Sequence, residues 1–262
     1  MLKKIMLLLP VLALMALPVL AADLNNDGLD DAREFPVPAN YTKVDGAIAI
    51  DDVGTAVGDY TTRLQSLGYT VTAIAADSDL ETLLDYALVI LPVGHGDAGN
   101  YPPFDGLSLD YHTYVETGGG LWVGQPNPWQ HPGNEATVTW VPYLLHVQNP
   151  YNNGDCPVAI VDDTHCITAG YPGADFSFPA DTVDEMGPEW DVLVEGPLTG
   201  SPSVLVAEYG AGKILVEFGH PSLGSSCSFD DTAMRQYVEC TLGGGSVATQ
   251  SLSLDGVKAL FK

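Results

Sequence analysis

Basic residues are scarce in this chain: 9 Lys and Arg stand against 34 Asp and Glu among 262 residues, which gives a formal net charge of −25. Nucleic acids and anionic membranes are bound by clustered Lys and Arg, so a surface this acidic repels both. We therefore expect no nucleic-acid partner. The same charge balance favours solubility and the binding of divalent cations.

The sequence also lacks long apolar runs, with one exception, Ile5–Leu20, which follows two lysines. A positive start, an apolar centre and small residues at the end, here Leu20-Ala21-Ala22 or one residue earlier, are typical of a secretory signal peptide. A membrane anchor is the alternative, but Pro10 and Pro18 interrupt the run and it is short for a span. We expect residues 1–22 to be cleaved, which predicts a secreted or periplasmic protein without a membrane span and with 7 basic and 34 acidic residues.

Cysteine is sparse as well, and no CxxC or Cys-x-His spacing suggests a metal site or a catalytic thiol. In an exported chain an even number of cysteines indicates disulfides, here two. Three connectivities are open, and we favour the two pairs that are local in sequence. These pairs are Cys156–Cys166 and Cys227–Cys240.

An acidic segment follows the predicted cleavage point and matches D-x-[DN]-x-[DN]-G-x5-E, the twelve-residue calcium loop, with Gly28 at its sharp turn. No entering helix precedes it, so it resembles the single acidic loops of dockerin and thrombospondin type 3 segments. It predicts a structural Ca²⁺ ion, and a solvated acidic terminus is the alternative. The six expected ligands are Asp23, Asn25, Asp27, Leu29, Asp31 and Glu34.

The fold class is indicated by apolar runs that alternate with helical patterns. Residues 87–93 are apolar without alternation, as in a strand buried on both faces. A helix over 107–117, a Gly-Gly-Gly stop and a strand over 121–123 complete a right-handed crossover, which implies a parallel sheet. The same alternation predicts further strands at 46–50, 69–74, 158–161, 190–194, 203–208 and 213–218, and helices at 59–67, 80–86 and 231–242.

These elements predict an α/β fold, a doubly wound, mostly parallel flavodoxin-like sheet whose last two strands form an antiparallel edge hairpin. Residues 127–154 break the rhythm, and we interpret them as an insertion over the carboxyl edge of the sheet with one helix at 140–147. The predicted organisation is a signal peptide (1–22), a calcium-loop segment and linker (23–43), the α/β domain (44–243), and a linker with a C-terminal tail (244–262).

Ligands of doubly wound sheets bind at the carboxyl ends of the strands, and several polar residues are expected there. Carboxylates and imidazoles could bind a metal or exchange protons. The structural alternative is that Asp51 and Asp52 cap the next segment and that His165 and His220 hydrogen-bond to loops. Catalytic candidates are His220, His95 and Asp51; ligand-binding candidates are Gln125, Asn127, Trp129 and Asp97.

Aromatic residues lie in or beside the insertion, where exposed rings would suit a carbohydrate or another cell-surface component. The commoner alternative is that these rings form the core beneath the insertion. They are Trp122, Trp129, Trp140 and Tyr143. The remaining histidines are interpreted as surface or packing residues; they are His112, His131 and His146.

Three segments, Tyr86–Gln125, Asp162–Gly170 and Val204–Ser222, resemble the class I glutamine amidotransferase-like superfamily, and within it the trehalose-utilisation-type branch. The resemblance spans roughly residues 44–243. The DxxHxITxG pattern of the second segment is similar to that branch's His-Pro-Ile-Thr-x-Gly, with Cys166 where Pro is common.

The superfamily's chemistry needs a Cys nucleophile after the fourth strand, a His that activates it and a Glu that orients the His. Gln125 occupies the nucleophile position, and an amide cannot attack a carbonyl. His220 matches the family's His, but Ser222 replaces the Glu. The resemblance therefore implies no glutamine hydrolysis and favours a secreted non-catalytic binding or structural module. The alternative is a secreted hydrolase or sugar-modifying enzyme that uses the acids and histidines at the strand ends.

Overall fold

The computed structural model describes eight segments of the chain, all within Val37–Lys262, the second of the two compact units into which the chain divides. The predicted signal peptide, calcium loop, Pro-rich linker and C-terminal tail lie outside these segments. None of the described helices is long and apolar enough to cross a membrane. The described residues are 46–54, 56–94, 109–128, 132–148, 159–169, 182–196, 200–219 and 231–242.

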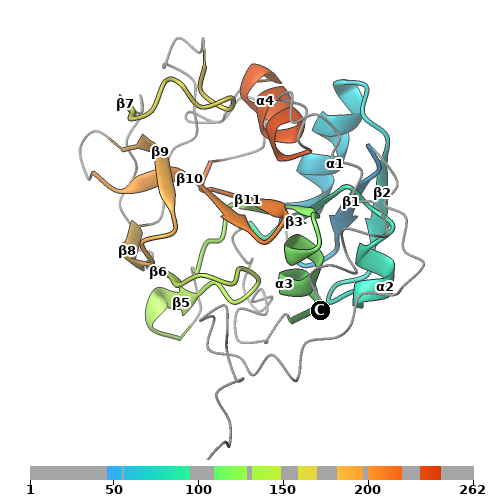
Figure 1. Cartoon of the computed structure of the whole chain (residues 1–262), viewed down its shortest axis with the longest axis horizontal. Helices are drawn as coiled ribbons and strands as arrows, with labels where there is room; N and C mark the ends of the chain where they lie inside the picture. The colour runs from blue at the N-terminus through green and yellow to red at the C-terminus, as the bar shows by residue number, and fades with distance from the viewer. Residues whose placement is uncertain are drawn as a thin grey trace, which may run out of the picture. The chain divides into compact units, whose positions relative to one another are not determined.

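An eight-stranded sheet forms the centre of this unit (Figure 1). Its order is β2 (Val71–Ile74), β1 (Ile48–Asp51), β3 (Leu88–Pro92), β4 (Gly120–Gly124), β11 (Gly212–Glu217), β10 (Pro202–Tyr209), β9 (Asp191–Glu195) and β7 (Ala159–Ile160). The first five strands are parallel, and the last three pair antiparallel. This confirms the predicted doubly wound, mostly parallel sheet and the antiparallel pairing of β10 with β11. The predicted position of that hairpin at the edge is wrong, because β9 and β7 extend the sheet beyond β10.

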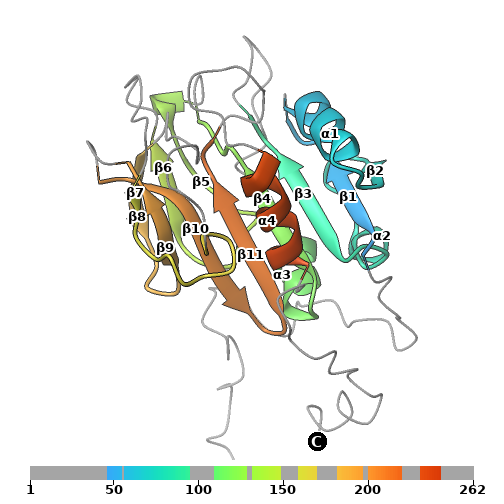
Figure 2. The same cartoon turned by 90° about the horizontal axis from the view of Figure 1, so that it is seen from above.

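Helices cover both faces of the sheet, and Figure 2 shows α4 lying across β4 and β11. On one face α1 (Val57–Ser66) and α4 (Asp231–Thr241) share a core with the side chains of Ile50, Trp122 and Leu215. On the other face α2 (Leu80–Leu83) and α3 (Leu109–Glu116) pack with the alternate strand residues. Every residue of β3 and β4 is buried, as their uninterrupted apolar sequences predict.

The insertion departs from the prediction, because no helix forms at 140–147. A short turn, η3 (Pro132–Asn134), leads into a second, antiparallel sheet of β5 (Glu135–Thr137), β6 (Leu145–Gln148) and β8 (Thr182–Met186). Burial in β6 alternates every second residue, as in a strand, and not every 3.6 residues, as in a helix. Leu145 and Val147 are buried, whereas His146 and Gln148 are half-buried. Trp140 is a buried residue of the preceding turn, and including it in the sequence pattern made the segment resemble a helix.

Candidate functional site at the carboxyl edge of the sheet

Three of the seven catalytic and ligand-binding candidates are described, and all three are buried. Asp51 ends β1 and is 0% exposed; Gln125 and Asn127 follow β4 and are 4% and 3% exposed. Glu217, which ends β11, is also 0% exposed and was not among the predicted site residues. The other candidates, His95, Asp97, Trp129 and His220, lie outside the described residues.

The turn after β4 holds Gln125 in a left-handed backbone conformation, with φ = +50°. That conformation is unfavourable for a residue with a side chain and recurs where a sharp turn is needed for function. The Gln125 N–H donates a 2.6 Å hydrogen bond to the carbonyl oxygen of Glu217 on the neighbouring parallel strand. The elbow expected from the family resemblance is therefore present as backbone geometry, while its side chain is an amide.

Glu217 lies directly beneath this elbow, and its carboxyl group is fully buried. Its Oε1 accepts a hydrogen bond from the Tyr60 hydroxyl of α1, and its Oε2 accepts one from the Gly219 N–H at 2.6 Å. A Cβ atom on Gly124 would lie 2.2 Å from the Tyr60 hydroxyl oxygen, so only glycine fits at the end of β4. The carboxyl group is thus held by a helix and a turn that packing brings together.

Burial raises the pKa of Glu217 to about 8, and its hydrogen bonds with Tyr60 and Gly219 only partly offset that rise. The carboxyl is therefore mostly protonated at neutral pH. Burial and the neighbouring Glu217 also raise the pKa of Tyr60, so its phenol stays protonated and remains a hydrogen-bond donor. A neutral acid in a dry site stabilises the turn without presenting a charge.

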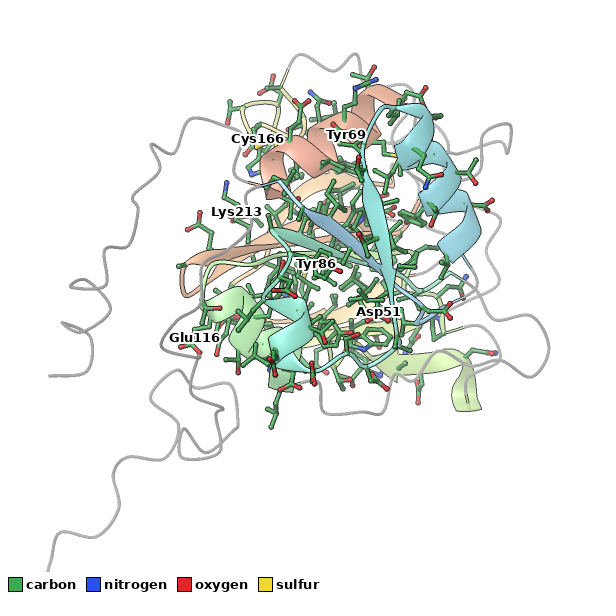
Figure 3. The ribbon with its side chains drawn as sticks, turned by 90° about the vertical axis from the view of Figure 1, so that its right-hand side faces the viewer. Asp51, Tyr69, Tyr86, Glu116, Cys166 and Lys213 are labelled. Atoms are coloured by element: carbon green, nitrogen blue, oxygen red, sulfur yellow. A yellow bond between two sulfur atoms is a disulfide. The ribbon has the colours of Figure 1, made fainter. Side chains whose placement is uncertain are left out.

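Asp51, which is labelled in Figure 3, ends β1 and forms a second carboxyl–phenol pair with Tyr111. Its Oδ2 accepts a hydrogen bond from the Tyr111 hydroxyl of α3, and its Oδ1 has no hydrogen-bond partner among the described residues. Burial raises the pKa of Asp51 to about 7, and the charges of Asp77 and Asp52 add to that rise. The Tyr111 hydrogen bond works in the opposite direction. Asp52, the next residue in the chain, is exposed.

These two carboxyls lie on opposite faces of the sheet. Side chains alternate along a strand, and Ile50 and Leu215 both face the α1/α4 core. Asp51, one residue after Ile50, therefore faces α3, whereas Glu217, two residues after Leu215, faces α1. The acids share an edge of the sheet, but the sheet separates them, so they cannot work as an acid–base pair on one substrate.

The described aromatic candidates belong to the core. Trp122 and Trp140 are 0% exposed, and Trp122 packs edge-on against Tyr60 and Tyr237. Tyr143 is half-buried, and its hydroxyl donates to the Glu208 carbonyl at 2.8 Å. For Trp122 and Trp140 the packing interpretation is confirmed and the sugar-platform interpretation is wrong, and Tyr143 packs against the same core while remaining partly exposed.

The described histidines fit their structural interpretations. His165 Nδ1 accepts the Ile167 N–H at 3.2 Å, which stabilises the turn of the DxxHxITxG segment. His112 Nε2 lies 3.0 Å from the Thr139 carbonyl oxygen in a buried position. His146 Nδ1 lies 2.6 Å from Asp184 Oδ1 on the second sheet, outside the carboxyl edge.

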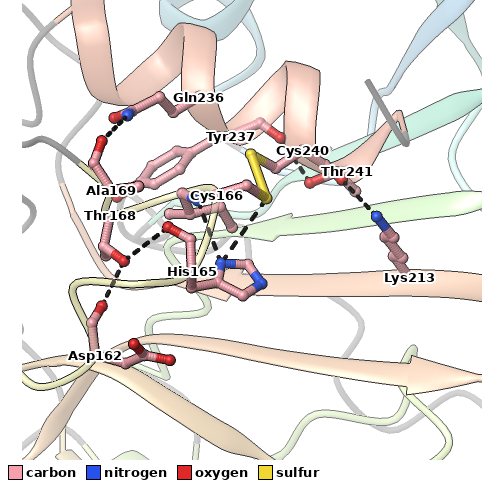
Figure 4. The surroundings of a disulfide bond; sticks show 11 residues. Asp162, His165, Cys166, Thr168, Ala169, Lys213, Gln236, Tyr237, Cys240 and Thr241 are labelled. Atoms are coloured by element: carbon pink, nitrogen blue, oxygen red, sulfur yellow. Dashed lines mark hydrogen bonds between the residues drawn. A yellow bond between two sulfur atoms is a disulfide. The ribbon is translucent and has the colours of Figure 1, made fainter. Parts of the chain in front are cut away.

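The disulfide pairing differs from the prediction, because Cys166 is bonded to Cys240, 74 residues away, with their Cα atoms 6.0 Å apart (Figure 4). Neither expected local pair forms; Cys156 and Cys227 lie outside the described residues. The cause is tertiary: the turn that follows β7 packs on the last turns of α4, where Gln236 Nε2 also donates to the Ala169 carbonyl at 3.2 Å. Proximity in sequence was the wrong guide to proximity in space.

No family model matches the chain, and no curated protein matches it. Solved structures do match. The cytoplasmic protein STM3548 from Salmonella typhimurium is 15% identical, with a TM-score of 0.52 over 75% of this chain and 98% of that one. A protein from Thermoplasma acidophilum that is described as a component of GMP synthase is 14% identical, with a TM-score of 0.51 over 76% and 94%.

A glutamine amidotransferase also matches, at 14% identity over 76% of this chain and 100% of that one, but its TM-score of 0.49 carries no weight here. The two likenesses above 0.5 show the fold alone. They support, at that level, the amidotransferase-like fold expected from the sequence.

Proposed function

We propose that the chain is a secreted, non-catalytic binding or structural module built on the amidotransferase-like fold. One observation carries the proposal: the elbow after β4 keeps its left-handed backbone, but its side chain is the buried amide of Gln125. An amide oxygen or nitrogen is too weak a nucleophile to form the covalent intermediate on which the family's chemistry depends. The geometry has therefore been retained while the attacking atom has been replaced.

The surroundings of the elbow support a scaffolding role. The Gln125 N–H is already bonded to the Glu217 carbonyl oxygen, so it does not serve as a free oxyanion donor. The Glu217 carboxyl is mostly protonated and bonded to Tyr60 and Gly219, so it is a poor general base at neutral pH. Each polar group at this corner stabilises the junction of β4, β11 and α1.

The proposed partner is a carbohydrate or another cell-surface component. Trp122 and Trp140 are core residues, so among the tryptophans of that region Trp129 remains the candidate for stacking on a sugar. The test is a glycan array probed with the mature protein and with Trp129→Ala. If the wild type binds a glycan and Trp129→Ala does not, the result supports a carbohydrate partner. If both proteins bind equally, or neither binds, the proposal of a carbohydrate partner at Trp129 is wrong.

We also propose that residues 23–34 bind one Ca²⁺ ion with a structural role, on the strength of their complete ligand spacing. Isothermal titration of the mature chain with Ca²⁺ should give one site. Glu34→Gln removes the expected bidentate ligand and should abolish that site, whereas Glu208→Gln, at an exposed position of β10, should leave it unchanged. Equal heats for all three proteins would argue that the loop stays empty.

The second candidate, a secreted hydrolase or sugar-modifying enzyme, is favoured by one observation: two carboxyls at the carboxyl edge have raised pKa values, and such groups gather at active sites. Because Asp51 and Glu217 face opposite sides of the sheet, such an enzyme would use one of them with a histidine. Hydrolysis that both Asp51→Asn and His220→Ala lose would support this candidate over the module.

A further inference from the structure

The Cys166–Cys240 disulfide is accessible from one side only. Cys166 lies in the turn that follows β7 and is exposed, whereas Cys240 lies in the last turn of α4 and is 7% exposed. An external thiol must approach the sulfur that it attacks in line with the bond that breaks. Access therefore favours attack at Cys166, with Cys240 as the leaving group.

Two polar side chains lie near this bond: His165 lies beside the Cys166 sulfur, and Lys213 lies at the backbone of Cys240 (Figure 4). His165 Nδ1 lies 4.0 Å from Cys166 Sγ and also accepts the Ile167 N–H, and burial lowers the pKa of this imidazole, which disfavours its protonation. Lys213 Nζ donates a 3.2 Å hydrogen bond to the Cys240 carbonyl oxygen. This ammonium group lies at the carboxyl end of α4, where its charge favours an anion that leaves from Cys240, and the same charge also lowers the pKa of His165 beside Cys166.

The bond anchors a helix that supports the elbow. Tyr237 of α4 packs edge-on against Trp122, with ring centroids 5.3 Å apart, and Trp122 packs edge-on against Tyr60 at 5.4 Å. Tyr60 in turn donates to Glu217 beneath the elbow. The disulfide therefore lies at the start of a continuous series of packed rings that ends at the carboxyl edge of the sheet.

We propose that Cys166 is a site of covalent modification by external thiols, where exchange opens the disulfide and releases the end of α4 from the turn at 162–169. A thiolate attacks Cys166 Sγ; a new sulfur–sulfur bond forms to the external sulfur, and the bond to Cys240 breaks. Cys240 leaves with the electron pair and takes a proton from water, so it is reduced while the external thiol is oxidised into the mixed disulfide. A second thiolate then displaces the first from Cys166, which leaves two protein thiols and one external disulfide.

Closure reverses this sequence with a disulfide oxidant. The Cys166 thiol loses its proton to water, and the resulting thiolate attacks one sulfur of the oxidant, whose other sulfur leaves as a thiolate. The Cys240 thiolate then attacks Cys166 Sγ, the disulfide re-forms, and the external sulfur leaves as a thiolate. The inference is independent of the proposed module function, because it depends on neither Gln125 nor a ligand.

The test uses the full mature protein and reduced glutathione at pH 8, followed by alkylation with N-ethylmaleimide and peptide mapping, with the peptides of Cys156 and Cys227 read separately. The expected result is glutathione on Cys166 and N-ethylmaleimide on Cys240. Hydrogen exchange within residues 236–242 should accelerate in the adduct. Glutathione on Cys240, modification of this pair only in urea, or unchanged exchange in the adduct would each overturn the proposal.

A pair of charge variants tests the leaving group. Lys213→Gln removes the ammonium beside Cys240 and should slow adduct formation roughly fivefold, the scale of one exposed charge interaction. Arg235→Gln makes the same charge change on an exposed residue of α4 that faces Tyr69, and it should leave the rate unchanged. Equal rates for the two variants would contradict the assigned role of Lys213 in stabilising the leaving thiolate.

Discussion

Glu217→Gln is expected to stabilise the folded chain at neutral pH and to leave its stability nearly unchanged at pH 4. Glu217 has a pKa of about 8 in the folded chain and an ordinary value of 4.5. Between these values the folded state keeps a proton that the unfolded state releases, so raising the pH favours unfolding. A neutral amide of the same shape removes this proton linkage, and its amide nitrogen can donate to the Tyr60 hydroxyl oxygen while its oxygen accepts the Gly219 N–H.

The size of the effect follows from the pKa of Glu217. Each pH unit between 4.5 and 8 lowers the free energy of unfolding by up to about 1.4 kcal/mol, so the loss at pH 7 reaches about 3 kcal/mol. Glu217→Gln should regain that amount at pH 7 and very little at pH 4. Asp51 contributes a similar pH dependence to the free energy of unfolding between pH 3.8 and about 7, and this contribution is the same in wild type and Glu217→Gln.

The assay is urea unfolding followed by tryptophan fluorescence at pH 4, 5.5, 7 and 8, for wild type, Glu217→Gln and Glu208→Gln. Glu208 is exposed on β10, so its variant corrects for the loss of one negative charge from an acidic surface. The difference between Glu217→Gln and wild type should grow with pH, while Glu208→Gln shows no such growth. A difference that does not change with pH, or a less stable Glu217→Gln at pH 7, would refute a protonated carboxyl beneath the elbow.

Three further tests, each by urea unfolding, address the packing around the two buried pairs. Gly124→Ala should lower the free energy of unfolding by about 1–3 kcal/mol or more, because its Cβ would meet the buried phenol of Tyr60. Gly58→Ala is the control: its Cβ would have no atom within 4 Å, so the free energy of unfolding should rise by about 0.5–1 kcal/mol. Equal effects of the two substitutions would show that the end of β4 has room for a side chain. Gln125→Gly should be about 1 kcal/mol more stable than Gln125→Ala, since only glycine adopts the left-handed turn freely; the reverse order would deny the strained elbow. Tyr111→Phe should destabilise more at pH 8 than at pH 5, because its hydroxyl donates to an Asp51 that is ionised only at the higher pH; a loss that is equal at both values would contradict this.

The parallel sheet could be predicted because its strands have an unmistakable composition. Residues 88–92 and 120–124 are apolar without alternation, and helices cover both of their faces. The Gly-Ala-Gly turn at 210–212 between two β-rich runs likewise gave the β10–β11 hairpin correctly. Local patterns of this kind need no knowledge of distant residues.

The second sheet and the disulfide depend on distant partners, which the sequence does not specify. β6 is only four residues long and pairs with β8, so its two-residue period is easily overlooked beside the apolar Trp140 and Val141. Cys166 and Cys240 meet only because α4 packs beside the turn after β7. The spacing of the cysteines in the sequence therefore does not predict that they pair.

The sequence contained a signal for Glu217 that the list of candidate site residues did not include. It is an acid at the end of the apolar run Ile214–Val216, which is a signal for a buried carboxyl. Its partner Tyr60 is 157 residues away, and only the pairing of β4 with β11 beneath α1 brings the two together. The sequence could therefore suggest the acid, but not its protonation or its place beneath the elbow.

The central claim is that the elbow at Gln125 supports no chemistry, and a turnover measurement tests it most directly. Mature wild-type protein and Gln125→Ala should be incubated with glutamine and with chromogenic glycosides, esters and amides, with and without Ca²⁺. The account predicts no release of product above the buffer rate for either protein. Turnover by the wild type that Gln125→Ala abolishes would contradict it.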